Sequence, residues 1–127
     1  MTIENPKAFG VSVFIQNSEG KILSVARRKD PNDWALIGGQ IEDNETEMEA
    51  AVRECKEETG LTIWNLKEII RRNVGPDLGV SFSCEWTGEP KTQPGEPECR
   101  WVSPEVLTHG VFGEYNSSLL RKLNIIQ

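Results

Sequence analysis

The feature that most constrains the fold of this chain is one segment, residues 39–61, in which a short acidic loop leads directly into an amphipathic helix. Thr46 precedes the helix and Glu49 follows three positions later, which is the pattern of a capping box. Gly60 fits the left-handed position at which many helices end. We therefore predict a helix from about Glu47 to Thr59.

The predicted helix has an apolar face and an acidic face. The apolar residues at helical spacing, which we expect to be buried, are Met48, Ala51, Val52 and Cys55. The acidic face carries Glu54, Glu57 and Glu58, and like charges at this spacing repel by about 0.2–0.5 kcal/mol per pair. A divalent cation would offset that repulsion, and three carboxylates with one open side suit Mg²⁺. A solvated acidic face is the alternative interpretation of the three glutamates taken alone.

The complete pattern of glycines and charges matches a fixed template, whose chance occurrence is on the order of 10⁻⁹ per start position at roughly 5–7% usage of each residue type. Residues 39–61 resemble the Nudix box, G-x5-E-x7-R-E-U-x-E-E-x-G-U, where U is an aliphatic residue. Its glycine and charged positions are all filled, by Gly39, Glu45, Arg53, Glu54, Glu57, Glu58 and Gly60. Cys55 stands at an aliphatic position and can pack as a small apolar side chain.

The resemblance implies a hydrolase that cleaves a phosphoanhydride with the help of Mg²⁺, for which Mn²⁺ can substitute. The implied metal ligands are the carboxylates of Glu54, Glu57 and Glu58 and the backbone carbonyl of Gly38. Arg53 is expected to orient these carboxylates, and Glu45 is expected to brace the loop against the helix. The general base is Glu57, Glu58 or an acidic residue of a later loop.

That later loop contains two candidate acids. Glu98 is the first choice as an additional catalytic and metal-binding residue, because family members often place an acid a few residues before a tryptophan like Trp101. Glu96 is the second choice. The alternative is that both glutamates are ordinary surface charges.

The C-terminal segment bears on the substrate. Residues 112–123 resemble the end of MutT-type family members, which hydrolyse oxidised-guanine nucleotides, and Asn116 matches an asparagine that contacts the purine there. An amide both donates and accepts hydrogen bonds, which suits the adjacent polar atoms of a purine. Tyr115 is expected to border the base pocket. The alternative role for Asn116 is the N-cap of the last helix. Gln40 is a departure, because MutT-type members have lysine there.

The most specific function that we predict is hydrolysis of a nucleoside triphosphate to the monophosphate and pyrophosphate, with a preference for purines. Arg27 and Arg28 end a predicted strand and are candidate phosphate contacts, with Arg28 assigned to the substrate site; two solvated side chains are the equal alternative. Pro76 is similar to a proline found in Nudix ADP-ribose pyrophosphatases, although turns favour proline in any case. An ADP-ribose or dinucleotide polyphosphate pyrophosphatase is therefore the alternative enzyme. A non-catalytic nucleotide-binding module is the alternative of another class. The complete set of box glutamates favours an enzyme.

Bulk properties restrict the partners and the location. A length of 127 residues predicts a single domain, 1–127, and a net charge of −6 argues against binding to a nucleic acid polymer. There is no apolar run of the roughly 20 residues that span a bilayer, and the N-terminus lacks a signal pattern. The three cysteines are widely spaced and predict neither a disulfide framework nor a zinc site. We therefore expect a cytoplasmic protein that acts on a small nucleotide and does not bind membranes.

The remainder of the chain alternates apolar runs with turn signals. Strands are predicted over residues 8–16, 22–26, 61–72, 80–86 and 100–102, and the first two are expected to pair as a hairpin. Residues 30–33 and 87–98 are predicted loops. A helix is expected to start at 103–105, and the last helix is expected at about 115–123. These elements make an α/β domain, and the resemblance implies the Nudix α/β/α sandwich, with a mixed β-sheet between helices.

Overall fold

A computed structural model of the protein describes residues 8–127. Its strands are β1 (Gly10–Phe14), β2 (Ile22–Arg27), β3 (Asp30–Gln40), β4 (Thr62–Val74), β5 (Asp77–Thr87) and β6 (Cys99–Val102). Its helices are α1 (Glu47–Thr59), the 3₁₀-helix η1 (Pro104–Thr108) and α2 (Gly113–Lys122). Within this part of the chain, no helix is both long enough and apolar enough to cross a membrane.

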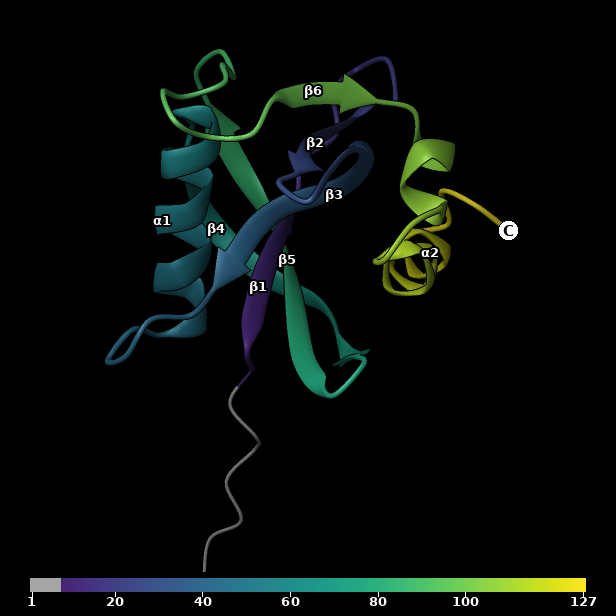
Figure 1. The fold of residues 1–127 in the computed structure, drawn as a ribbon, viewed down its shortest axis with the longest axis horizontal. Helices are drawn as coiled ribbons and strands as arrows, with labels where there is room; N and C mark the ends of the chain where they lie inside the picture. The colour runs from purple at the N-terminus through teal and green to yellow at the C-terminus, as the bar shows by residue number, and fades with distance from the viewer. Residues whose placement is uncertain (1–7) are drawn as a thin grey trace, which may run out of the picture.

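The six strands form one sheet in the order β4-β5-β1-β3-β2-β6. β1 and β5 are parallel, and the other neighbours are antiparallel. Helix α1 lies on one face of the sheet, and α2 lies on the other with η1 beside it (Figure 1). The predicted α/β fold with a mixed sheet between helices is therefore confirmed.

The predicted hairpin between the first two strands is wrong, because β3 lies between them. The C-terminal part of β3 pairs with β1, and its N-terminal part pairs with β2. Strands β1 and β2 meet at the bridge between Gln16 and Ile22, beside the predicted turn. The predicted loop at residues 30–33 is also wrong, because Asp30 opens β3 and pairs with Arg27. A strand of 11 residues is long enough to serve two partners in succession.

Helix α1 has the predicted bounds and caps. Thr46 and Glu49 form both halves of the capping box, and Gly60 has a φ of 79°, the left-handed conformation. The predicted apolar face is only half right, because Met48 and Val52 are 48% and 37% exposed. The helix instead buries Ala50, Ala51, Cys55, Glu58 and Thr59. Relative to the prediction, the helix is rotated about its axis so that the buried face includes Glu58, which lies against the sheet.

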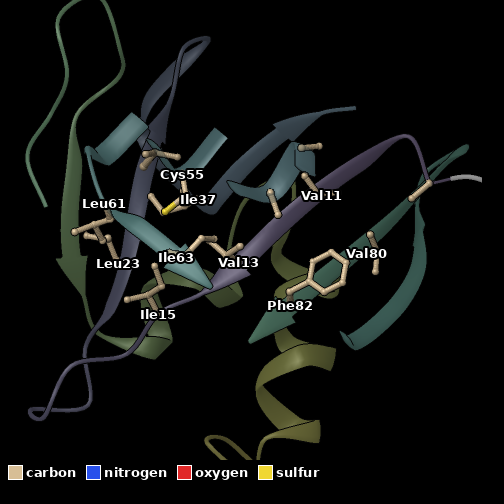
Figure 2. Packing of buried hydrophobic residues seen from close by; sticks show 14 residues of the cluster. Val11, Val13, Ile15, Leu23, Ile37, Cys55, Leu61, Ile63, Val80 and Phe82 are labelled. Carbon is tan, nitrogen blue, oxygen red and sulfur yellow. The ribbon is translucent and has the colours of Figure 1, made fainter. Parts of the chain in front are cut away.

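The apolar core has two parts, one on each face of the sheet. Figure 2 shows the first, in which Cys55 of α1 packs among side chains from the strands, including Val11, Val13 and Ile37. The second lies under η1 and α2, where Leu107, Leu119 and Leu120 are fully buried. These two cores fix α1 and α2 to opposite faces of β1 and β3.

Candidate active site

Arg53 is the centre of the charge network in the box. Its Nε and Nη2 donate to the two carboxylate oxygens of Glu45 at 2.7 and 2.9 Å, and Nη2 also donates to the carbonyl of Gln40 at 3.0 Å. Its Nη1 donates to Glu54 at 2.9 Å and to Glu57 at 3.3 Å. The hydrogen bond to Glu45 is the main reason that the pKa of Arg53 lies above its ordinary value. The guanidinium therefore ties the loop to the acidic face of α1.

Glu58 is the buried carboxylate of the box. It is 6% exposed, and its Oε1 accepts a hydrogen bond from the backbone N–H of Gly38 at 2.9 Å. The pKa of its carboxyl is raised to about 8, mainly by burial and to a smaller degree by the charges of Glu54, Glu96 and Glu57, while the hydrogen bond from Gly38 opposes the rise. One backbone donor is too little compensation for an ionised carboxylate at this depth.

Glu54 lies against the backbone of Gly39. A Cβ added to Gly39 would come within 2.4 Å of the carboxylate carbon of Glu54, so only glycine allows this approach. Burial raises the pKa of the Glu54 carboxyl, and Arg53 opposes that rise. Glu57, by contrast, is 49% exposed and is open to solvent.

The donor chemistry of these carboxylates fits a hard divalent cation. Carboxylate oxygens are the ligands that Mg²⁺ prefers. Burial and the neighbouring glutamates disfavour the ionised form of Glu58, and a bound cation would favour it. Over residues 8–127, no three acidic, histidine or cysteine side chains are gathered into a ready-made metal cage. Arg53 holds Glu54 and Glu57 at present, so a cation would compete with this guanidinium for their oxygens.

The loop acid whose charge acts on the box glutamates is Glu96, the second choice from the sequence. The charge of Glu96 contributes to the raised pKa values of Glu54 and Glu58. Glu98 instead forms an ion pair with Arg100 at 2.6 Å and is half exposed. Residues 88–98 have no regular structure, and strand β6 begins just after Glu98. The preference for Glu98 over Glu96 is therefore not supported by the structure.

A pocket of about 360 Å³ lies beside the box, on the sheet and against α2. Its wall includes Gly38, Gly39 and Gln40 from the end of β3 and Phe112, Tyr115 and Asn116 from the start of α2. Gly38 is required where β3 lies against β1, because an added Cβ would come within 2.0 Å of the carbonyl oxygen of Val11. The end of β3, which leads into the box, and the predicted purine-binding residues Tyr115 and Asn116 therefore line one cavity.

Asn116 lies inside α2, whose N-cap is Phe112, so the N-cap alternative for Asn116 is wrong. Asn116 is 2% exposed, and its Nδ2 donates to the carbonyl of Leu107 at 3.1 Å. This bond uses one of the two amide hydrogens. The amide oxygen and the second hydrogen remain for a molecule in the pocket.

Tyr115 borders the same pocket, but its ring is not a free stacking surface. The residue is buried and its ring lies against Gly79, where an added Cβ would meet the ring at 3.3 Å. Its hydroxyl is hydrogen-bonded to Ser81 at 2.7 Å, and burial raises its pKa. Tyr115 therefore lines the pocket as expected, while its hydroxyl is directed toward the interior of the protein.

Arg28 does not line the pocket. It is an exposed side chain that pairs with Glu96 at 3.2 Å. Arg27 lines the pocket instead, with Nη1 paired to the buried carboxylate of Asp33 at 2.9 Å and the guanidinium over the ring of Phe112 at 5.8 Å. A bulge between Ala26 and Arg27 shifts the strand register at this point, and alternation along the sequence gave no sign of it.

Sequence reasoning also missed the pocket residues that come from the middle of the sheet. Ser12 of β1 lines the cavity, and Ser81 of β5 is fully buried behind it. The only signal for them was a serine at an inward position of an otherwise apolar strand, which is too common to identify a site.

The comparisons with known proteins agree with this geometry. The model of the NUDIX domain family matches residues 6–123, and the chain therefore belongs to the Nudix family. An 8-oxo-dGTP diphosphatase from Haemophilus influenzae is 31% identical over 118 residues, which cover 86% of this chain and 85% of the relative. The m7GpppN-mRNA hydrolase NUDT17 from Xenopus laevis is 30% identical over 135 residues. That match covers 86% of this chain, but the chain spans only 46% of the length of NUDT17.

The fold is also shared with solved structures of the family. The crystal structure of a MutT NUDIX hydrolase from Burkholderia pseudomallei superimposes with a TM-score of 0.73. The superposition covers 94% of this chain and 99% of the other, at 18% sequence identity. At this level of identity the likeness concerns the fold alone.

Proposed function

We propose that this protein is a divalent-metal-dependent pyrophosphohydrolase that converts a nucleoside triphosphate, preferably a purine one, to the monophosphate and pyrophosphate. The observation that carries the proposal is the junction of the box with the pocket. Gly38 and Gly39 contact the carboxylates of Glu58 and Glu54, and the same two glycines line the cavity that ends at Asn116. One elongated molecule can therefore have its phosphates at the box and its base in the pocket.

Glu54, Glu57 and Glu58 would hold the metal, with the carbonyl of Gly38 and the carboxylate of Glu96 as further candidate ligands. Bound there, Mg²⁺ would neutralise phosphate charge and lower the pKa of the attacking water. Phosphoryl transfer needs positioning and charge neutralisation more than covalent chemistry from the protein, which suits a site built of carboxylates.

The remaining residues of the box act on these carboxylates. Arg53 orients Glu54 and Glu57, and Glu45 fixes the guanidinium of Arg53 through two hydrogen bonds. The backbone N–H of Gly38 holds Glu58 in place. Glu57 is the exposed member of the set, so it is the one that a water molecule reaches most easily, and we assign the general base to it.

The preference for purines rests on Asn116. Its bond to Leu107 fixes the amide and uses one amide hydrogen, which leaves one acceptor and one donor. A purine offers a matching acceptor and donor on one edge, and an oxidised guanine offers an N–H donor next to a carbonyl. The relative from H. influenzae is named for hydrolysis of such a nucleotide, which supports the proposal.

The test is a substrate panel with Mg²⁺ in which phosphate, pyrophosphate and nucleotide products are quantified. The panel contains guanine, oxidised-guanine, adenine and pyrimidine nucleoside triphosphates, ADP-ribose and a dinucleotide polyphosphate. Release of pyrophosphate from a purine triphosphate, with the highest kcat/KM of the panel, is the expected result. A clear preference for ADP-ribose or for the dinucleotide would replace the proposed substrate. If no member of the panel is hydrolysed, the proposal that the protein is an enzyme is contradicted.

A further inference from the structure

Three hydroxyl groups from three different elements meet at the pocket. Ser12 Oγ of β1 is 2.6 Å from Ser81 Oγ of β5, and Ser81 Oγ is 2.7 Å from the hydroxyl oxygen of Tyr115 in α2. Ser12 and Tyr115 line the pocket, whereas Ser81 is fully buried behind them. The three residues thus form a hydrogen-bonded chain whose pocket end is Ser12.

The sheet itself sets this arrangement. Ser12 and Ser81 are partners in the parallel register of β1 and β5, so their side chains lie next to one another on the same face. Gly79 lies two residues before Ser81 and leaves the space that the Tyr115 ring occupies. Without a side chain at Gly79, the phenol hydroxyl reaches Ser81.

The hydrogen bonds among the three hydroxyls have a preferred direction of donation. Each hydroxyl carries one proton, and the two hydrogen bonds use two of the three. A phenol is a stronger acid than an aliphatic alcohol and is therefore the better donor. The order that this acidity favours has Tyr115 donating to Ser81 and Ser81 donating to Ser12. In this order neither of the two bonds uses the Ser12 proton, which can then be donated to an acceptor in the pocket.

The face on which Ser12 lies shows which part of a nucleotide it would meet. Val11 and Val13, its neighbours in β1, belong to the core on the α1 face, so Ser12 points to the α2 face. The glutamates of the box are on α1. The pocket that Ser12 lines also contains Gly38, Gly39 and Asn116, so a molecule with its phosphates at those glutamates and its base at Asn116 would pass along Ser12.

We propose that Ser12 is a specificity-determining residue, which donates a hydrogen bond to an acceptor atom of the nucleoside, and that Ser81 is the residue that positions its hydroxyl. This inference rests on the proposed function and names a contact within the same pocket. Ser81 is fully buried, so it acts on a ligand only through the two pocket residues that it contacts, and the proposal assigns its effect to Ser12 rather than to Tyr115.

A double-mutant cycle tests this directly. Steady-state kinetics are measured for the wild type, Ser12→Ala, Ser81→Ala and the double variant, with the triphosphate that the wild type hydrolyses best. Each single substitution should raise KM about three- to tenfold with kcat nearly unchanged, as expected for one lost hydrogen bond that is equal in ground and transition states. In the Ser12→Ala background, Ser81→Ala should change KM by less than about twofold, because the two act as a unit.

Ser24→Ala is the matched control. Ser24 is also fully buried in the sheet, its hydroxyl donates to the carbonyl of Ile22 at 3.2 Å, and it is not among the residues that line the pocket. This variant should lose stability to a degree similar to that of Ser81→Ala, with KM unchanged. An equal rise in KM for Ser24→Ala, or an equal effect of Ser81→Ala in both backgrounds, would overturn the proposal.

The substrates then locate the acceptor. A loss in Ser12→Ala that differs between guanine, oxidised-guanine and adenine deoxynucleotides places the acceptor on the base, and a loss that differs between dGTP and GTP places it on the sugar. An unchanged KM of Ser12→Ala for all of them would overturn the proposal. If the wild type hydrolyses none, the proposed function fails on its own, and the same cycle is measured on the dissociation constant of a non-hydrolysable GTP analogue.

Discussion

The carboxylate of Glu58 accepts a hydrogen bond from the backbone N–H of Gly38 at 2.9 Å, although the two residues are 20 positions apart in the chain. This bond joins α1 to β3 at the point where the pocket meets the box. It also holds a carboxylate in a buried position where burial and neighbouring glutamates disfavour its charge. Proton and metal binding at Glu58 should therefore be coupled to the stability of the fold.

The first prediction concerns pH and the metal-free protein. The pKa of the Glu58 carboxyl is raised from 4.5 to about 8 in the folded state. Between these values the folded state binds a proton that the unfolded state has released, so stability is greatest near the lower value and falls as the pH rises toward 8. The slope contributed by this one group is at most about 1.4 kcal/mol per pH unit.

Urea denaturation in EDTA at several pH values between 5 and 8.5 measures this slope. Glu58→Gln is the matched variant, because a neutral side chain of the same length cannot titrate. Its stability should vary less steeply with pH than that of the wild type. Identical slopes for the two proteins would assign the dependence to other groups.

The second prediction is that Mg²⁺ or Mn²⁺ raises the melting temperature. A cation that binds only the folded state stabilises it by about 2.7 kcal/mol at 100 times its dissociation constant. The shift should be larger at pH 8 than at pH 5, because the cation competes with the proton on Glu58. NaCl at matched ionic strength is the control. A shift of the same size in NaCl would mean that the acidic face is only a solvated surface.

The third prediction is that Glu57→Gln abolishes turnover in a folded protein. Loss of a carboxylate that contributes to metal binding and accepts a proton should reduce kcat by at least about 10²-fold. The fold should persist, because Glu57 is half exposed and its pair with Arg53 is a surface interaction worth at most about 1 kcal/mol. Initial rates at saturating Mg²⁺ and a thermal melt are measured together. Glu89→Gln, in an exposed loop, is the matched control and should have normal rates. Near-normal rates for Glu57→Gln would mean that Glu57 is not part of the active site.

The parts of the fold that depend on local sequence were predictable, and those that depend on distant pairing were not. Thr46, Glu49 and Gly60 specify the bounds of α1 by hydrogen bonds within a few residues, so the helix was predicted correctly. The insertion of β3 between β1 and β2 is a long-range pairing, and the local turn signal at residues 17–20 favoured a hairpin instead.

The same distinction applies to the site. Arg53, Glu54, Glu57 and Glu58 lie on one helix, so their proximity follows from helical spacing. In the structure Arg53 is hydrogen-bonded to Glu54, to Glu57 and to Glu45 of the preceding loop. Hydrophobicity predicted that Met48 and Val52 are buried, but the helix instead buries Glu58, whose partner, the backbone N–H of Gly38, lies on another element and leaves no local signal in the sequence. The positions of Glu96 and Glu98 depend on an irregular loop, for which periodicity gives no information.

The last prediction concerns Asn116 and the choice of base. Because Asn116 lies within α2 and bonds to Leu107, its replacement by alanine removes a buried hydrogen bond and should lower stability by roughly 1–3 kcal/mol whatever its role in binding. Stability alone therefore does not distinguish a structural residue from one that contacts the base. The ratio of kcat/KM between two substrates does, because the fraction of folded enzyme cancels in the ratio. If Asn116 contacts a purine, Asn116→Ala should reduce discrimination between purine and pyrimidine triphosphates by about 1–3 kcal/mol, which is roughly a 5- to 150-fold change in the ratio. The measurement is kcat/KM for guanine, oxidised-guanine, adenine and pyrimidine triphosphates, well below the melting temperature of the variant. A uniform loss with unchanged ratios would leave Asn116 as a structural residue that holds α2 to η1.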